Sequence, residues 1–437
     1  MKLIKNSFSL AFLLFAITVA AQDRLSLEQA IETGLKNNYT IVLARNNVSI
    51  AANNNSLGNA GFLPTVTAGS NLNNNISSAR NEYFNGNISE KDNAKSQSLN
   101  ANVQLNWVIF DGFKMFVDKN RYAEMQNLSE LQLRTGIENT IAEIILSYYN
   151  IVQQQKALSV LDNAIYYSTQ RRTLMKTKLN IGAASEVDYL QACVDLNADS
   201  VAWLQQLATL QNLKADLNNL IGRDYKTGFT ISDTIRAEQL LSYETLVSLA
   251  NQNNVDIITA QSNAQIAQLN YQLTHSPVYP RVNVFGGYNM ARSEAEVGIM
   301  KSARSQGPSY GLSVSYTLFN GFNNYRNSQN AKIILNTSKI TMEETIENIN
   351  MRLYQLFNDY QNNLTAIRFE TESVSLARRN TFLTFERYKL GMTSDLDFRQ
   401  TQYIQLETEN RLLLAQYKAK QTETELLRIS GQLIKSN

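Results

Sequence analysis

The segment LSLEQAIETGLKNNYTIVLARNNVSI, residues 25–50, occurs a second time in altered form as LSYETLVSLANQNNVDIITAQSNAQI, residues 241–266. The offset of 216 that relates these segments also pairs Pro64 with Pro280. Further along the chain an offset of 209 pairs FDGF at 110–113 with FNGF at 319–322, and it also relates four pairs of single residues: Gly182 and Gly391, Asp188 and Asp397, Gln191 and Gln400, and Gly222 and Gly431. This agreement indicates two homologous halves, residues 22–222 and 241–437, joined by a linker at 223–240.

The first 21 residues have the three parts of a secretory signal peptide. Lys2 and Lys5 precede an apolar run from Phe8 to Ala20, which ends in a small-residue site. The run is too short to span a bilayer as a helix, and no later stretch reaches the roughly 18 apolar residues that spanning requires. Removing residues 1–21 takes away two of the 40 basic residues and none of the 38 acidic ones. We therefore expect an exported protein of near-zero charge, without a transmembrane helix and without a basic footprint for nucleic acid.

Each half is predicted to run helix, strand, loop, strand, long helix, turn, long helix. Apolar residues at steps of three and four, such as Ile137, Ile141 and Ile144, give a heptad-like seam that polar residues dilute. Gly182 and Gly391 are expected at the turns between long helices, where positive φ is needed. The long helices are expected at about 113–180, 185–221, 322–389 and 394–430. All four prolines stand at or just before a predicted strand, so none interrupts these helices.

A helix of some 67 residues would be on the order of 100 Å long, which no ordinary globular domain needs. A coiled-coil rod is the plain alternative for the helices, but it leaves the strands unexplained. Only 43% of the residues are hydrophobic, which also argues against one large globular core.

Four segments alternate between apolar and polar residues with the period of a β-strand. In the second segment Leu99, Val103 and Trp107 share one face. The strands are expected at about 65–75, 99–110, 281–291 and 309–319, each near the 9 to 11 residues that a tilted strand needs to cross a membrane. A soluble sandwich would show the same alternation, but the signal peptide favours a membrane barrel. The polar stretches 76–98 and 292–308 are then expected to be extracellular loops.

Aromatic residues cluster where the second and fourth predicted strands end. Such a cluster is typical of the girdle at a membrane interface. The residues assigned to this girdle are Trp107, Phe110, Phe113, Phe319 and Phe322.

Four strands cannot close a barrel, and lipid does not tolerate unpaired strand edges, so several copies must share one barrel. Two chains would give the minimum of eight strands and three would give twelve. The long helices would then assemble into a second, helical cylinder whose diluted seams suit a tube wall. The expected fold class is mainly α with a transmembrane β-barrel.

The duplicated halves, the FDG and FNG turns after a strand, and the paired segments LNIGAASEVDYLQ (179–191) and YKLGMTSDLDFRQ (388–400) resemble the TolC outer-membrane efflux protein family. The resemblance covers residues 22–437. It implies a homotrimer in the outer membrane, surrounded by lipid, whose twelve-strand β-barrel continues into a periplasmic tunnel of twelve helices. It also implies two partners, a periplasmic adaptor protein and an inner-membrane pump.

The resemblance further implies a gate at the helix tips. By position in the motif, Asp397 matches an aspartate of the family's ring, and Gln400 stands where a second aspartate is expected. Tyr388 and Asp188 match the latch tyrosine and its aspartate, while Thr393 occupies the place of the latch arginine, so the latch is only partly retained. A ring of Asp397 carboxylates would attract cations. The alternative is that Asp188 and Asp397 merely lie near helix N-termini, where carboxylates are favoured.

The chain lacks the residues of common catalytic and metal sites. One histidine, His275, and one cysteine, Cys193, cannot supply a zinc site or a Cys/His catalytic pair. There is no phosphate-binding glycine loop and no Gly-x-Ser-x-Gly elbow. We expect no enzyme activity, no cofactor and no metal. The leading hypothesis is a passive exit duct of a tripartite efflux or type I secretion system. The alternatives are a dedicated metal-cation exporter duct and a non-conducting structural envelope protein.

Overall fold

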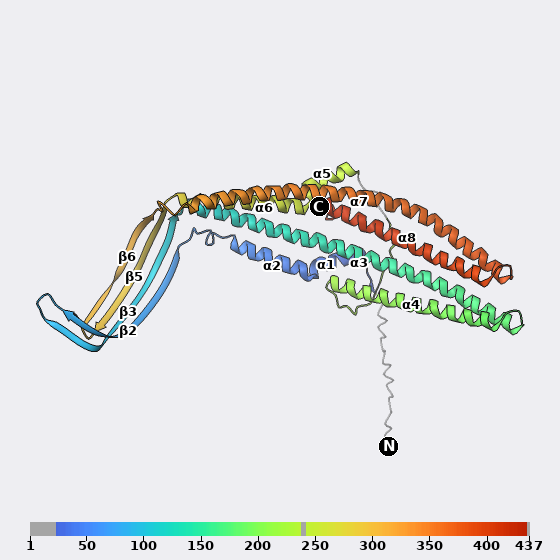
Figure 1. Cartoon of the computed structure of the whole chain (residues 1–437), viewed down its shortest axis with the longest axis horizontal. Helices are drawn as coiled ribbons and strands as arrows, with labels where there is room; N and C mark the ends of the chain where they lie inside the picture. Colours follow the sequence, from blue (N-terminus) through green and yellow to red (C-terminus); the bar gives the residue numbers. More distant parts are fainter. Residues whose placement is uncertain (1–22, 237–241, 435–437) are drawn as a thin grey trace, which may run out of the picture. The chain divides into compact units, whose positions relative to one another are not determined.

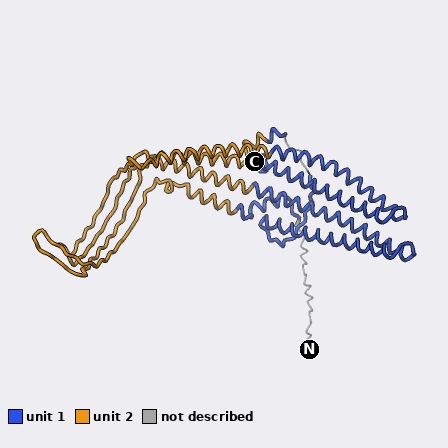
Figure 2. Tube along the Cα trace, viewed as in Figure 1, with its two compact units in different colours: residues 1–41, 138–246, 353–437 blue, residues 42–137, 247–352 orange. Residues whose placement is uncertain are grey.

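The computed structural model describes residues 23–236 and 242–434, which form two compact units (Figure 1; Figure 2). Unit 1 takes its residues from 1–41, 138–246 and 353–437, and unit 2 from 42–137 and 247–352. Each unit therefore contains segments of both homologous halves. The fold class is as predicted, mainly helical with a small antiparallel sheet. The predicted signal peptide lies outside the described residues.

Two pairs of long helices make up nearly half of the chain. α3 and α7 have 67 residues each, and α4 and α8 have 35 each, so the two halves build matching pairs. All four begin and end within one residue of the ranges expected from the sequence. The helices are α1 (Leu27–Asn37), α2 (Tyr39–Asn54), α3 (Lys114–Asn180), α4 (Glu186–Leu220), α5 (Tyr243–Asn253), α6 (Val255–Leu273), α7 (Asn323–Lys389) and α8 (Asp395–Ile429), with the short 3-10 helix η1 (Ser276–Val278). Over the described ranges, none of the helices combines the length and apolarity needed to cross a membrane.

The turn between the two long helices is built in the same way in both halves. Gly182 and Gly391 have φ of +74° and +76°, a conformation that favours glycine. The backbone bonds follow the Schellman pattern, in which the Ala183 amide donates to the Lys178 carbonyl (2.7 Å) and the Met392 amide donates to the Arg387 carbonyl (2.9 Å). Ser185 and Ser394 then cap α4 and α8. Local sequence therefore determines where each helix ends and the next begins.

The core of unit 1 forms where α1, α3 and α4 pack against one another, against the residues just before α1 and against the segment that follows α4. Its buried residues are Leu25, Ala30, Ile144, Tyr148, Ile151, Val152, Leu210, Leu217, Ile221, Phe229 and Ile231. β1 (Asp23–Arg24) pairs in parallel with β4 (Phe229–Thr230) beside this core. Residues 223–236, expected to belong to a linker, are thus not a free connection, because they place Phe229 and Ile231 in the core. The Tyr148 hydroxyl also donates to the Leu25 carbonyl, at 3.1 Å, and to Asp233.

Unit 2 contains a four-stranded antiparallel sheet (Figure 1). Its strands are β2 (Thr65–Glu82), β3 (Ile88–Phe110), β5 (Arg281–Ala295) and β6 (Ser302–Ser315), in the order β2-β3-β5-β6. Consecutive hairpins therefore lie side by side, and β2 and β6 form the two edges.

The strands run further than the sequence pattern predicts. Residues 76–98 and 292–308, expected to be loops, are largely strand, and the turns between strands are reduced to 83–87 and 296–301. The prediction was wrong because apolar alternation ends near residue 76, whereas the ladder is held by backbone hydrogen bonds that Asn, Ser and Lys side chains do not prevent.

The fourth strand shows the opposite error. It was expected at 309–319, but β6 ends at Ser315, and residues 316–319 are not strand. Within the chain, Ser315 pairs with Arg281, the first residue of β5. Residues 316–319 therefore have no partner strand to hold them extended.

Candidate functional site

The tips of the two helix pairs meet in a dry aromatic cluster within unit 1. Its buried residues are Met175, Ala192, Phe385, Tyr388 and Phe398, which come from all four long helices. The ring of Tyr388 stacks on that of Phe398 at 5.5 Å, and Phe385 lies 5.0 Å from Phe398. Apolar burial therefore joins α3 and α4 to α7 and α8 at this end of the unit.

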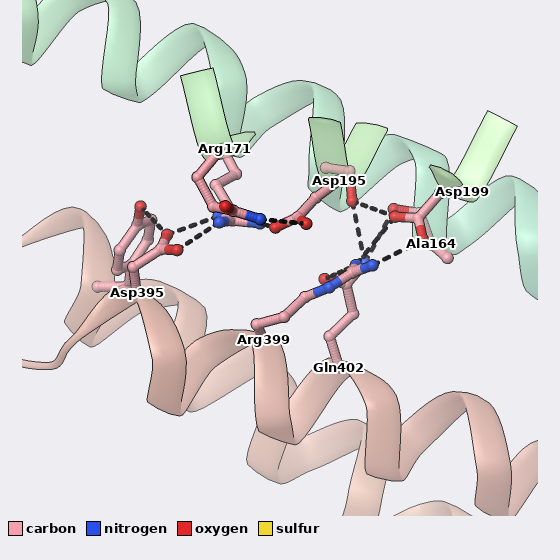
Figure 3. Close-up of polar contacts among 10 residues, drawn as sticks. Ala164, Arg171, Asp195, Asp199, Asp395, Arg399 and Gln402 are labelled. Carbon is pink, nitrogen blue, oxygen red and sulfur yellow. Dashed lines mark hydrogen bonds and ion pairs between the residues drawn. The ribbon is translucent and has the colours of Figure 1, made fainter. Parts of the chain in front are cut away.

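Arg171 of α3 is the centre of an ionic cluster beside these rings (Figure 3). Its side chain is 1% exposed. Its Nε donates to Asp395 Oδ1 of α8 at 2.5 Å, its Nη2 donates to the second oxygen of the same carboxylate, and its Nη1 donates to Asp195 of α4 at 2.5 Å. The Tyr388 hydroxyl of α7 completes the group by donating to Asp395 at 2.6 Å. One guanidinium thus ties together residues from four helices, in the forked geometry that favours arginine over lysine.

A second set of contacts lies one turn further along α4 and α8. Arg399 donates to both oxygens of Asp199, each at 2.9 Å. Gln402, 5% exposed, donates to the Ala164 carbonyl of α3 at 3.0 Å. The Ser168 hydroxyl donates to the same Asp199 carboxylate. Figure 3 shows both sets bridging the two helix pairs.

The pKa values of Arg171, Asp195 and Tyr388 are shifted by their surroundings. Burial acts against the charge of Arg171, but its hydrogen bonds to Asp395 and Asp195 outweigh this effect and raise its pKa. Burial likewise opposes the charge of Asp195, and the bonds from Arg171 and Gln191 nonetheless lower its pKa. The pKa of Tyr388 is raised by burial and by its bond to Asp395, so its hydroxyl stays protonated and acts as a donor.

Comparisons with known proteins identify the family of this chain. The family model of the outer membrane efflux protein matches residues 30–223 and 246–432, once for each half. The chain belongs to this family. Comparison with curated protein sequences gives no match.

Solved structures share the fold of this efflux protein at low sequence identity. A membrane protein from Pseudomonas aeruginosa has a TM-score of 0.78 at 15% identity, over 94% of this chain and 91% of that one. The outer membrane protein VceC from Vibrio cholerae has a TM-score of 0.72 at 14% identity, over 93% and 96%. The Campylobacter jejuni CmeC outer membrane channel has a TM-score of 0.73 at 15% identity, over 94% and 87%.

The gate residues predicted for this efflux protein lie at the same helix tips. Asp188 and Asp397 are the third residues of α4 and α8, and each exchanges hydrogen bonds with its capping serine. These serine bonds lower the pKa of both carboxyls. Thr393 donates to Asp397 at 3.3 Å, and Gln400 is exposed on α8.

The expected latch pairing takes a different form within this chain. Among the described contacts, Tyr388 bonds to Asp395 and not to Asp188, whose partner is Ser185. The reason is geometric, because the N-cap serine already binds Asp188 from three residues away, while Asp395 starts α8 beside the Tyr388 ring. Whether Asp397 and Asp188 serve a gate stays a prediction.

The predicted girdle residues gather where strands meet long helices in unit 2. Phe113 and Phe322 follow Gly112 and Gly321 and have φ of +66° and +62°, a left-handed conformation rare for phenylalanine. Trp107 donates from its indole to the Phe62 carbonyl at 2.9 Å. The rings of Phe110 and Phe113 meet edge to face at 5.2 Å, and those of Phe319 and Phe322 do so at 5.3 Å. Their place at a membrane interface stays a proposal.

Sequence reasoning missed the ionic cluster itself. Two local signals were present, namely Asp195 with Asp199 on α4 and Asp395 with Arg399 on α8, each spaced by one helical turn. Neither pair points to Arg171, because charged residues at such spacing are most often on a solvated helix face.

Proposed function

We propose that this efflux protein is the passive exit duct of a tripartite efflux or type I secretion system. Several copies, three by the family resemblance, join their sheets into one β-barrel in the outer membrane. Their long helices continue this barrel as a tunnel into the periplasm. A periplasmic adaptor protein and an inner-membrane pump supply selection and energy, since a duct of this kind performs no chemistry of its own.

The observation that carries this proposal is the uncovered apolar face of the sheet in unit 2. Val103 and Trp107 of β3 are 50% and 43% exposed, and Leu312 of β6 is 62% exposed. The alternate positions carry Asn, Gln and Ser, as in Asn102 and Gln104. A soluble domain rarely leaves so extended an apolar face in water. Lipid would cover this face, and the polar face would then line a wet lumen.

The helix tips supply the narrow end of the proposed duct. Asp397 is exposed at the start of α8, and the hydrogen bonds from Ser394 lower the pKa of its carboxyl, which favours the charged form. Copies arranged around one axis would bring their Asp397 carboxylates together, and a ring of this kind would bind cations at the constriction. Arg171 and the aromatic cluster would hold each chain's two helix pairs together behind that ring.

Conductance of the purified protein in planar lipid bilayers tests the function. The expected result is discrete current steps. Because a trace of a contaminating porin also conducts, Arg171→Met and Arg172→Met are measured in parallel. Arg171 is buried among carboxylates, whereas Arg172 is exposed on the same turn. A current that changes only with Arg171→Met originates from this chain. Reproducible absence of current from correctly inserted protein would refute the duct and favour a structural envelope protein.

A further inference from the structure

The apolar face of the sheet in unit 2 ends in a band of charged residues. On β3 this face runs from Leu99 to Trp107, and on β5 it runs from Val282 to Met290. Each stretch covers about 27 Å along its strand, which is about 21 Å across a membrane for a strand tilted by about 40°. The next residue of β5 on this face is Arg292, so the apolar band stops there.

Two arginines lie directly opposite each other at this border. Arg292 of β5 pairs with Arg304 of β6, and side chains in such a pair start about 5 Å apart on one face. Arg292 donates to Glu294 Oε1 from Nε at 3.1 Å and from Nη2 at 2.6 Å. Arg304 donates to the neutral Gln306 at 3.2 Å, and no described ion pair includes it. Like charges that face each other on a sheet repel, so the protein alone leaves this pair unbalanced.

The two arginines border a groove whose other residues are apolar or small. The groove has a volume of about 490 Å³ and is lined by Leu99, Met290, Arg292, Ser302, Ala303 and Arg304. Leu99 and Met290 are 37% and 39% exposed and belong to the end of the apolar band. A ligand that fits this groove therefore carries a negative group beside a hydrocarbon part.

A larger, polar cavity lies nearer the turns between the strands and shares Ser302 with the groove. It has a volume of about 1070 Å³, and its lining includes Asn74, Lys95, Gln97, Glu294, Glu296 and Lys301. Glu294 pairs with Arg292, and Glu296 pairs with Lys91 at 3.0 Å. The described ion pairs contain neither Lys95 nor Lys301. The cavity therefore offers amide and ammonium donors, which suit the hydroxyls and a further anionic group of a sugar.

We propose that this border binds a phosphorylated glycolipid of the outer leaflet. The inference rests on the membrane location in the proposed function, in which the end of the sheet away from the long helices faces outward (Figure 1). Arg292 and Arg304 clamp one phosphate between two forked guanidinium groups, and the phosphate removes their mutual repulsion. The acyl chains lie along Leu99 and Met290, and the sugar occupies the polar cavity. A glycerophospholipid would fill the clamp but leave that cavity to water.

Lipid binding to the assembled, detergent-solubilised full chain tests the proposal. The probe is lipid A, an acylated glucosamine disaccharide that carries phosphate, and native mass spectrometry counts its bound copies. Lipid A without its phosphates and phosphatidylglycerol are measured beside it. We expect lipid A to bind about tenfold more tightly than either, because only it offers both the charge and the sugar. Equal binding of dephosphorylated lipid A would overturn the clamp, and equal binding of phosphatidylglycerol would overturn the choice of a glycolipid.

Substitutions locate the site on the sheet. Arg292→Gln and Arg304→Gln each remove half of the clamp and should weaken lipid A binding about tenfold, because each removes charge-assisted hydrogen bonds. Arg281→Gln is the matched control, since Arg281 begins β5 at the other end of the strand, is exposed, and alternates with the apolar face. It should bind lipid A like the unsubstituted chain. An equal loss in all three variants would indicate a general attraction between basic protein and anionic lipid and would overturn the site.

Thermal stability gives a readout whose sign depends on the lipid. In neutral detergent without lipid A, Arg304→Gln should raise the dissociation temperature of the assembled protein, because it relieves the repulsion from Arg292. With saturating lipid A the same variant should dissociate at a lower temperature than the unsubstituted chain, because it loses the stabilisation that a bound ligand gives. A shift in one direction under both conditions would overturn the proposal. Protein that conducts in bilayers but fails these tests refutes the lipid site and leaves the duct, whereas protein that neither inserts nor conducts refutes both.

Discussion

Replacing Arg171 by methionine should loosen the helix tips of a single chain. The substitution keeps much of the side-chain length but leaves Asp395 and Asp195, whose side chains are 34% and 17% exposed, without their cation. Removing one partner of a buried pair costs about 3 to 5 kcal/mol. Because water reaches Asp395, we expect the lower end, about 3 kcal/mol. At about 1.4 kcal/mol per factor of ten, this corresponds to roughly a hundredfold increase in local opening.

Hydrogen exchange of the assembled protein measures this opening. Amides near residues 164–175 and 395–402 should lose about two orders of magnitude of protection, while the core around Ile144 should not change. Arg172→Met is the matched control, since Arg172 is exposed beside Arg171. Adding Asp395→Asn to Arg171→Met should restore part of the lost protection, because the unpaired Asp395 carboxylate is what destabilises the tip. If Arg171→Met and Arg172→Met exchange alike, the ionic cluster does not hold the helix pairs together.

Two further predictions concern the charges at the tips. Asp397→Ala and Asp188→Ala both remove the third residue of a capping box, so both should destabilise a tip by about 1 kcal/mol. Only Asp397→Ala should weaken block of single-channel current by multivalent cations, and equal block in both variants would remove Asp397 from the gate. The second prediction follows from the pKa of Asp195, which is lowered in the folded chain. Its contribution to stability is present at neutral pH and is lost as the pH falls below the ordinary aspartate value of about 4. Tip protection, corrected for the intrinsic exchange rate, should therefore be constant from pH 8 to 5 and fall only below about pH 4; a fall near pH 6 would contradict this assignment.

The features that sequence reasoning located are those that single residues or short motifs determine. A glycine that accepts positive φ followed three residues later by a capping serine marks each helix tip, as at Gly182 and Ser185. The absence of proline allows the long helices. The strand ends were less well predicted, because polar residues such as Asn74 and Lys95 join the ladder by backbone pairing, which an apolar pattern does not indicate. These limits follow from what an apolar pattern can indicate, which is only the part of a strand that carries apolar side chains on one face.

The ionic cluster lay outside the reach of such patterns because its members are far apart in the chain. Arg171 and Asp395 are separated by 224 residues. Their contact depends on how two helix pairs pack, which the sequence determines only through the whole core. The aromatic residues of that core, such as Phe398, show helical spacing but do not reveal which other helix they contact.

The ionic cluster also distinguishes two kinds of contact in the proposed assembly, namely the contact between the helix pairs of one chain and the contact between neighbouring copies. At the helix tips the offset of 209 relates residues of different charge: Arg171 to Asn380, Asp195 to Ile404, Asp199 to Thr408, and Leu190 to Arg399. Glu186, the counterpart of Asp395, would face Asn380 of a neighbouring copy and not a guanidinium. The helix pairs of one chain are therefore bound by buried charge, whereas the equivalent contact between copies lacks it, so tips that separate would part between copies first.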